Sequence, residues 1–227
     1  DYDSKKSGGI TMSHLRFGDQ PIRSTYLIDE ADYIGCHVQA YVNQYDVLKG
    51  LRKGGNFVLN CIWTEEELES KLPAKMKRFI AENEINLYTI NATKIATEIG
   101  LGRRINMIMQ SAFFKLAEII PEDEAKDYLK ASIKKAYGKK GDKVVNMNFE
   151  AVERGMNSLV KINVPASWKD AEDAEVVETK KVTDFVKNIM NPMNALEGDK
   201  LPVSAFNGIE DGTFPAGTAA YEKRGIA

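Results

Sequence analysis

A short polar segment near the start of the chain has the composition of a phosphate-binding loop. Residues 4–9 read Ser-Lys-Lys-Ser-Gly-Gly and stand directly before an apolar run. Lys5 and Lys6 can neutralise phosphate charge, hydroxyl and amide groups can donate hydrogen bonds, and Gly8 and Gly9 allow close backbone approach. An exposed turn with ordinary solvated lysines explains the same composition equally well. The segment therefore predicts an anion site at Lys5, Lys6, Gly8 and Gly9, with the plain turn as its alternative.

Three further side chains stand near predicted strand ends. His14 and Arg16 lie at the end of the first predicted strand, residues 10–17, and His37 lies where a strand passes into a helix. Open α/β sheets bind ligands outside the carboxyl ends of their strands. Arg16 is therefore a candidate ranked below the two lysines, while both histidines are interpreted as structural. No phosphate loop, dinucleotide fingerprint or Gly-x-Ser-x-Gly elbow occurs, and we predict no catalytic or metal-binding residue.

The cysteine count and the charge balance exclude several classes of protein. Cys36 and Cys61 are the two cysteines, too few for a four-cysteine zinc site or an iron–sulfur cluster. Both lie in apolar runs, so we expect buried, reduced thiols in a cytoplasmic protein, with a disulfide as the lesser alternative. Lys and Arg number 31 against 33 Asp and Glu, a net charge of −2. This balance argues against nucleic-acid or membrane-surface binding, and no apolar run is long enough to span a bilayer.

Strand-like and helix-like patterns alternate through residues 1–165. The predicted strands are residues 10–17, 33–36, 57–63 and 85–90, and the clearest is the apolar run from Phe57 to Ile62, which we expect to be buried on both faces. The predicted helices are residues 38–48, ended by Gly54-Gly55; 64–80, with a capping box at Thr64 and Glu67 and a break at Pro73; 91–99; 105–116; 122–137; and 149–160. This alternation predicts a three-layer α/β/α domain with a mainly parallel or mixed sheet.

The composition changes after Pro165, so residues 166–227 are expected to form a separate region. Residues 170–178 carry five acidic and no basic side chains, as in a solvated spacer. Residues 182–190 have the pattern of one short amphipathic helix, ended by Pro192. Residues 193–227 show no sustained period of either kind and are punctuated by glycine and proline. They are expected to form an extended C-terminal tail or connector.

Several strings of the chain occur in the order found in a known family. They are residues 4–9; 13–18 (Ser-His-Leu-Arg-Phe-Gly); 31–37; 55–60; 99–106 (Ile-Gly-Leu-Gly-Arg-Arg-Ile-Asn); and 113–116 (Phe-Phe-Lys-Leu). Together they resemble the gamma-type domain of the pyruvate:ferredoxin (flavodoxin) oxidoreductases. Residues 211–218 and 221–227 resemble the connector that precedes the ferredoxin-like domain of that family.

The resemblance implies an interior module of a 2-oxoacid oxidoreductase. Enzymes of this family decarboxylate pyruvate on thiamine diphosphate and magnesium, pass electrons through iron–sulfur clusters to ferredoxin or flavodoxin, and form acetyl-CoA. It implies that Lys5, Lys6, Gly8 and Gly9, with Arg16 ranked lower, help to bind coenzyme A. Thiamine diphosphate and the clusters belong to other domains or subunits, which would be the partners of this chain. The Gly-Asp-Gly magnesium motif is missing from this sequence, so we expect the chain alone to be inactive.

Two alternatives stay open at this point. The chain could be a purely structural clamp between domains, or a free-standing flavodoxin-like binder of a nucleotide or flavin. The resemblance also implies that the family's first glycine-rich strand and loop would precede Asp1, which leaves a sheet edge or ligand wall incomplete. A start without methionine or signal sequence likewise suggests a segment of a longer chain.

Overall fold

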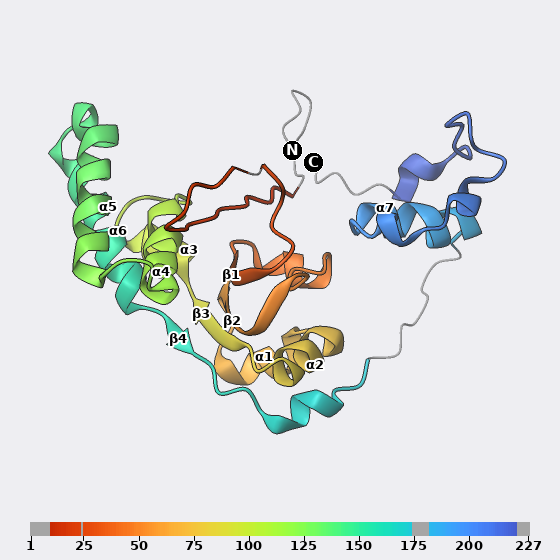
Figure 1. Cartoon of the computed structure of the whole chain (residues 1–227), viewed down its shortest axis with the longest axis horizontal. Helices are drawn as coiled ribbons and strands as arrows, with labels where there is room; N and C mark the ends of the chain where they lie inside the picture. Colours follow the sequence, from red (N-terminus) through yellow and green to blue (C-terminus); the bar gives the residue numbers. More distant parts are fainter. Residues whose placement is uncertain (1–9, 24, 174–181, 222–227) are drawn as a thin grey trace. The chain divides into compact units, whose positions relative to one another are not determined.

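The computed structural model describes residues 10–23, 25–173 and 182–221 (Figure 1). The chain divides into two compact units, one of residues 17–174 and one of residues 1–16 with 175–227. Lys5, Lys6, Gly8 and Gly9 lie outside the described residues. Among the described residues, no helix has the length and apolar character needed to cross a membrane.

Four strands form the sheet of the first unit, in the order β1-β2-β3-β4. They are β1 (Ala31–Cys36), β2 (Leu51–Asn60), β3 (Asn86–Ile90) and β4 (Val160–Lys161). The first three are parallel, with Gly35 beside Val58 and Val58 beside Tyr88. β4 is antiparallel to β3, with Val160 beside Thr89. The predicted mainly parallel or mixed sheet is therefore confirmed.

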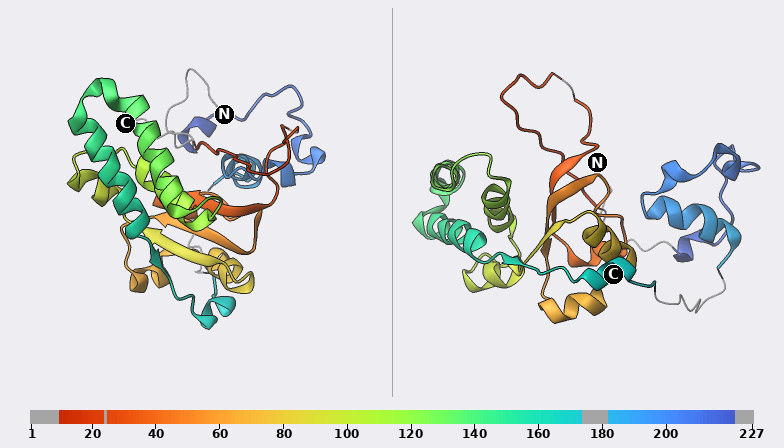
Figure 2. Two further views of the ribbon diagram at one scale, coloured as in Figure 1. Left: turned by 60° about the vertical axis from the view of Figure 1, so that its left-hand side comes forward. Right: turned by 60° about the horizontal axis from the view of Figure 1, so that its bottom comes forward.

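Helices cover both faces of this sheet, which gives the predicted three layers (Figure 2). One face carries α1 (Glu65–Lys71) and α2 (Ala74–Glu82); the other carries α3 (Ala92–Glu98), α4 (Asn106–Ala117) and α6 (Asp142–Asn157), and α5 (Glu122–Tyr137) packs against α6. Phe57 and Leu59 point into the core with α1 and α2, while Val58 points into the opposite core, and all three are 0% exposed. The prediction of an interior strand buried on both faces is confirmed as far as Asn60; Ile62 lies beyond the strand and is exposed.

Several helix boundaries follow from local sequence signals. The Thr64 hydroxyl accepts a hydrogen bond from the Glu67 N–H at 3.4 Å, and the Glu67 carboxylate accepts one from the Thr64 N–H at 2.9 Å. This reciprocal capping box satisfies two amides at the start of α1. Pro73 stands at the N-cap of α2 and separates the two helices. The Asn91 side chain accepts a hydrogen bond from the Lys94 N–H at 2.9 Å and begins α3.

Two predicted elements of the N-terminal part are wrong. Residues 10–17 contain no strand, and apolar side chains such as Met12 and Leu15 remain exposed instead of entering a core. The predicted helix at 38–48 is reduced to one 3-10 turn, η1 (Gln39–Asn43), and Gly54 lies inside β2 with a φ of 72°. The Gly54 N–H donates to the Asn83 carbonyl at 2.8 Å. Pairing of β2 with segments distant in sequence thus outweighs the local tendency of a glycine pair to end a helix.

The end of the first unit also differs from the prediction. α6 ends at Asn157 instead of continuing to residue 160, because the following residues pair with β3 as β4 and the Ile162 N–H donates to the Leu87 carbonyl at 2.9 Å. The chain then crosses to α1 and α2, where Trp168 is 2% exposed and donates a hydrogen bond to Glu69. The start of the acidic stretch is held there as well, since Arg78 pairs with Asp173 at 2.9 Å.

The second unit contains a short helix whose end differs from the prediction. A π-helical turn, η4 (Val186–Met190), continues directly into α7 (Asn191–Asn194), so Pro192 lies inside the helix and does not end it. The Asn191 N–H bonds to the Val186 carbonyl with π spacing, and Pro192 then occupies the first turn of α7, where a missing N–H is tolerated. Described residues 195–221 hold single 3-10 turns, namely η5 (Gly198–Lys200), η6 (Val203–Phe206) and η7 (Thr218–Tyr221). The predicted tail without a sustained helix or strand is therefore confirmed.

Candidate functional site

The predicted anion site is described at one of its five residues. Lys5, Lys6, Gly8 and Gly9 lie outside the described residues, and Arg16 is an exposed residue of an irregular segment. Arg16 therefore does not stand at the end of a strand, contrary to the expectation from the sequence. The joint placement of the five residues stays a prediction.

The carboxyl ends of β1, β2 and β3 meet at one edge of the sheet, and Asn60 links them. Asn60 is 7% exposed at the end of β2. Its Nδ2 donates to the His37 carbonyl at 2.9 Å, and its Oδ1 accepts from the Ala92 N–H at 2.9 Å. Nδ2 also lies 3.5 Å from the Thr93 Oγ1. One amide side chain thus ties the loops after β1 and β3 to the end of β2. The sequence analysis did not identify this role. Its signal was Asn60 itself, a single polar residue within the apolar run from Phe57 to Ile62.

The chain leaves this edge toward opposite faces of the sheet, because β2 leads into α1 and β3 leads into α3. Open α/β sheets form their ligand crevices between such diverging connections. The first turn of α1 carries three acidic residues, 65–67, whereas α3 offers Lys94. Two apolar residues that follow β1 and β2 at this edge are exposed, Val38 at 42% and Ile62 at 67%. The edge therefore suits an apolar group or a protein surface better than a phosphate.

Burial shifts the pKa values of the titratable side chains near this edge toward their neutral forms. Burial raises the pKa of Cys36 to about 11 and also raises the pKa of Cys61, so both thiols stay protonated at neutral pH. Both cysteines are free and buried, as predicted. His37 is an exposed residue after β1. Partial removal of its imidazole from water disfavours the charged form and lowers its pKa. Within the described ranges, no group of three His, Cys, Asp or Glu side chains is placed to hold a metal ion.

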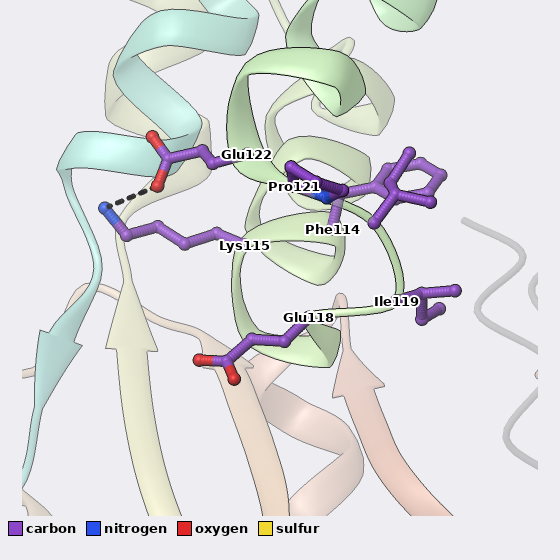
Figure 3. Close-up of a pocket in the computed structure, with 7 residues that line it drawn as sticks. Phe114, Lys115, Glu118, Ile119, Pro121 and Glu122 are labelled. Carbon is purple, nitrogen blue, oxygen red and sulfur yellow. Dashed lines mark ion pairs between the residues drawn. The ribbon is translucent and has the colours of Figure 1, made fainter.

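A second candidate site is a pocket of 420 Å³ at the corner between α4 and α5, here called the corner pocket (Figure 3). Its lining consists of Phe114, Lys115, Glu118, Ile119, Ile120, Pro121 and Glu122. Figure 3 shows the charged side chains on one side and Phe114, Ile119 and Pro121 on the other. Lys115 pairs with Glu122 at 3.9 Å. Sequence reasoning missed this site as well; its signal was the two apolar pairs, Phe113-Phe114 and Ile119-Ile120, on either side of a helix end.

Comparison with known proteins gives matches over both parts of the chain. A family model described as pyruvate ferredoxin/flavodoxin oxidoreductase matches residues 1–158. A second model, described as a domain of unknown function, matches residues 171–227. The two matches leave a short interval that contains the predicted change of composition at Pro165.

The chain is 63% identical over its whole length to pyruvate-flavodoxin oxidoreductase of Enterobacter agglomerans and 58% identical to pyruvate:ferredoxin oxidoreductase of Moorella thermoacetica. It spans only 19% of the length of each of these relatives. A crystal structure of pyruvate oxidoreductase subunit PORC from Thermotoga maritima is 17% identical, with a TM-score of 0.47 over 59% of this chain and 66% of that one. Because the family model covers most of the chain and the identities extend over all of it, the chain belongs to the pyruvate ferredoxin/flavodoxin oxidoreductase family.

Proposed function

We propose that this chain is an interior module of a pyruvate-type 2-oxoacid oxidoreductase, which helps to bind coenzyme A and to hold the thiamine and iron–sulfur domains in position. One observation carries the proposal: the chain aligns along its whole length with a fifth of two enzymes named pyruvate-flavodoxin and pyruvate:ferredoxin oxidoreductase. A cytoplasmic location is part of the proposal and is supported by two free thiols.

The cofactors of the whole reaction do not fit the residues of this chain. An iron–sulfur cluster needs a set of cysteines, and the two present are buried protonated thiols. The described residues hold no cluster of metal ligands, and the sequence lacks the Gly-Asp-Gly motif for the magnesium of thiamine diphosphate. We therefore assign thiamine diphosphate, magnesium, the clusters and the contact with ferredoxin or flavodoxin to other domains or subunits, and we expect this chain alone to be inactive.

The coenzyme A contact is assigned to the basic segment and not to the sheet edge. The 3′-phospho-ADP end of coenzyme A carries about four negative charges, so its site needs cations and hydrogen-bond donors. The carboxyl edge presents the acidic first turn of α1, which would repel such a group. Lys5 and Lys6, beside Gly8 and Gly9, supply two adjacent cations. Arg16 lies in the same N-terminal segment and supplies a third.

The test replaces both lysines with alanine in the complete enzyme. Loss of two exposed charge–phosphate contacts of about 1 kcal/mol each should raise the KM for coenzyme A roughly thirtyfold at low salt. Added salt should shrink this effect because it screens exposed charges. Decarboxylation of pyruvate without coenzyme A should be unchanged. The matched control replaces Lys139 and Lys140, another adjacent pair of lysines followed by a glycine.

The same experiment separates the alternatives. An unchanged KM for coenzyme A in the Lys5/Lys6 variant at low salt would remove the binding role and favour the structural clamp. An equal rise in the Lys139/Lys140 variant would show a general effect of surface charge instead of a site. A tightly bound yellow chromophore in the purified chain would favour the flavodoxin-like binder.

A further inference from the structure

The corner pocket opens onto a continuous row of aromatic rings. Phe17 is 50% exposed and stacks on Phe113 with ring centroids 6.0 Å apart. Phe113 in turn contacts Phe114 at 5.2 Å, and Phe114 lines the pocket. On the far side of Phe114, Ile119 is 39% exposed and points away from α4 (Figure 3). These residues give the first unit an exposed apolar surface with a hollow in it.

The conformation of the α4–α5 connection presents this surface to the outside. Glu118 adopts a left-handed backbone conformation, with a φ of 48°, which is uncommon for a residue that has a Cβ. The chain reverses there, so the apolar side chain of Ile119 follows on the surface and does not continue the buried stripe of α4, which includes Ile108 and Ala112. Contiguous exposed apolar surface with a polar rim often marks an interaction site, and the hollow here combines an apolar side with a charged side.

The charged rim of the pocket is partly neutralised by ion pairs of Glu122, while the Glu118 carboxylate adds a further negative charge. Glu122 pairs with Lys126 at 2.8 Å and with Lys115 at 3.9 Å. The hydrogen bond from Lys126 also lowers the pKa of Glu122, so its carboxylate stays ionised. In the part of the chain that the structure describes, no buried side-chain nitrogen or oxygen lacks a partner. The lining carries one net negative charge, from Glu118 and Glu122 against Lys115, which disfavours a small anion. An apolar protein segment can instead lie against Phe114, Ile119 and Pro121.

We propose that the corner pocket and Phe17 form a docking site for an apolar segment of the same polypeptide that lies outside this chain. The chain spans 19% of the length of the Enterobacter agglomerans relative, so about four-fifths of that enzyme lies outside the matched part and is available to contact it. Contacts between domains of one polypeptide typically bury an apolar patch with a polar rim. The proposal rests on family membership and not on the assignment of coenzyme A, so either can fail without the other.

Cross-linking in the complete enzyme tests the occupant directly. A photoreactive benzoyl-phenylalanine replaces Ile119, and a control replaces Tyr128, which is 65% exposed on α5 and outside the pocket. Cross-linked peptides are identified by mass spectrometry. We expect position 119 to join peptides from outside residues 1–227 at a yield at least about fivefold above position 128. Cross-links confined to residues 1–227, from the same or a second copy, would overturn the proposal, and so would the absence of any cross-link.

Hydrogen exchange in the complete enzyme gives an independent measurement. No hydrogen bond within the described residues protects the backbone amides of Ile119 and Ile120, so these amides should exchange rapidly unless another segment covers them. We expect slow exchange in the unmodified enzyme and exchange at least about tenfold faster in the Ile119→Asp variant. Rapid exchange in the unmodified enzyme, or slow exchange in both, would contradict docking at this site. Substitution at a partly exposed position leaves the fold intact, which an unchanged melting temperature checks.

Discussion

Replacing Asn60 with leucine should destabilise the first unit by about 2–4 kcal/mol, because it keeps the branched shape of the side chain and removes its hydrogen bonds. The larger part comes from Ala92, which is 0% exposed and whose N–H would lose the Asn60 acceptor 2.9 Å away. An unsatisfied buried donor costs about 1–3 kcal/mol. The His37 carbonyl loses its 2.9 Å donor but lies nearer to solvent, so it adds about 0.5–1.5 kcal/mol.

Urea unfolding of the chain, followed by circular dichroism, measures this loss against a matched control. Asn148 is a similarly buried asparagine, at 5% exposure, but its Nδ2 donates at 2.8 Å to the Val144 carbonyl of its own helix. That carbonyl stays within reach of the helix backbone when the side chain is removed, so Asn148→Leu should cost less than about 1 kcal/mol. Equal losses in the Asn60→Leu and Asn148→Leu variants would refute the idea that Asn60 joins three strand ends.

The stability of an Asn60→Asp variant should fall as the pH rises. The Asn60→Asp side chain can still accept from the Ala92 N–H, but its second oxygen faces the His37 carbonyl, which also accepts. Burial and this repulsion should raise the pKa of the new carboxyl above its unfolded value of about 3.9. The stability of the variant is then fully present below about pH 4 and is lost as the pH rises through the folded pKa. The free energy of unfolding of the variant and of the unmodified chain is measured between pH 4 and 7. A difference between them that does not change with pH would contradict this placement of residue 60.

Three further predictions concern single residues of the first unit. Val58→Asp should bury an unpaired charge at a 0% exposed position and cost several kcal/mol, so a variant that still melts cooperatively would contradict the interior placement of β2. Glu118→Gly should stabilise the chain by about 0.5–1 kcal/mol in urea unfolding, since glycine accepts the φ of 48° without strain. The pKa of Cys36 is raised to about 11 by burial, so its contribution to stability is present below the ordinary thiol pKa and is lost as the pH rises through 11. The unfolding free energy of Cys36→Ala should consequently fall less steeply over that interval than that of the unmodified chain.

The parts of the fold that the sequence predicted correctly are those specified by neighbouring residues. The capping box of Thr64 and Glu67, the break at Pro73 and the cap at Asn91 each act within one helical turn. The continuous apolar run from Phe57 predicted burial on both faces because both faces of a parallel sheet are covered by helices. Such signals need no knowledge of what lies far away in the chain.

The parts that could not be predicted depend on distant partners. Gly54 lies in an irregular part of β2, between Leu51 and Asn56, which both pair with β1. From the local sequence, the glycine pair instead predicts the end of a helix. β4 has two residues and exists because Val160 meets Thr89 at the edge of β3. Asn60 draws its hydrogen-bond partners from residues 23 and 32 positions away. The anion site at Lys5 and Lys6 is a different case, because the resemblance to a family, and not a pattern of spacing, suggested its ligand.

Burial sets the ionisation states of several titratable groups in the first unit. A catalytic acid or base works best with a pKa near the operating pH. Here burial raises the pKa of Cys36, Cys61 and Tyr33 and lowers that of His37, so each group is driven toward its neutral form at neutral pH. Near the carboxyl edge these shifts leave the two thiols in the protonated form, whereas the neutral imidazole of His37 can still accept a proton. At the same edge, the hydrogen bonds of Asn60 join the end of β2 to the residues after β1 and β3, a structural role that needs no titratable group.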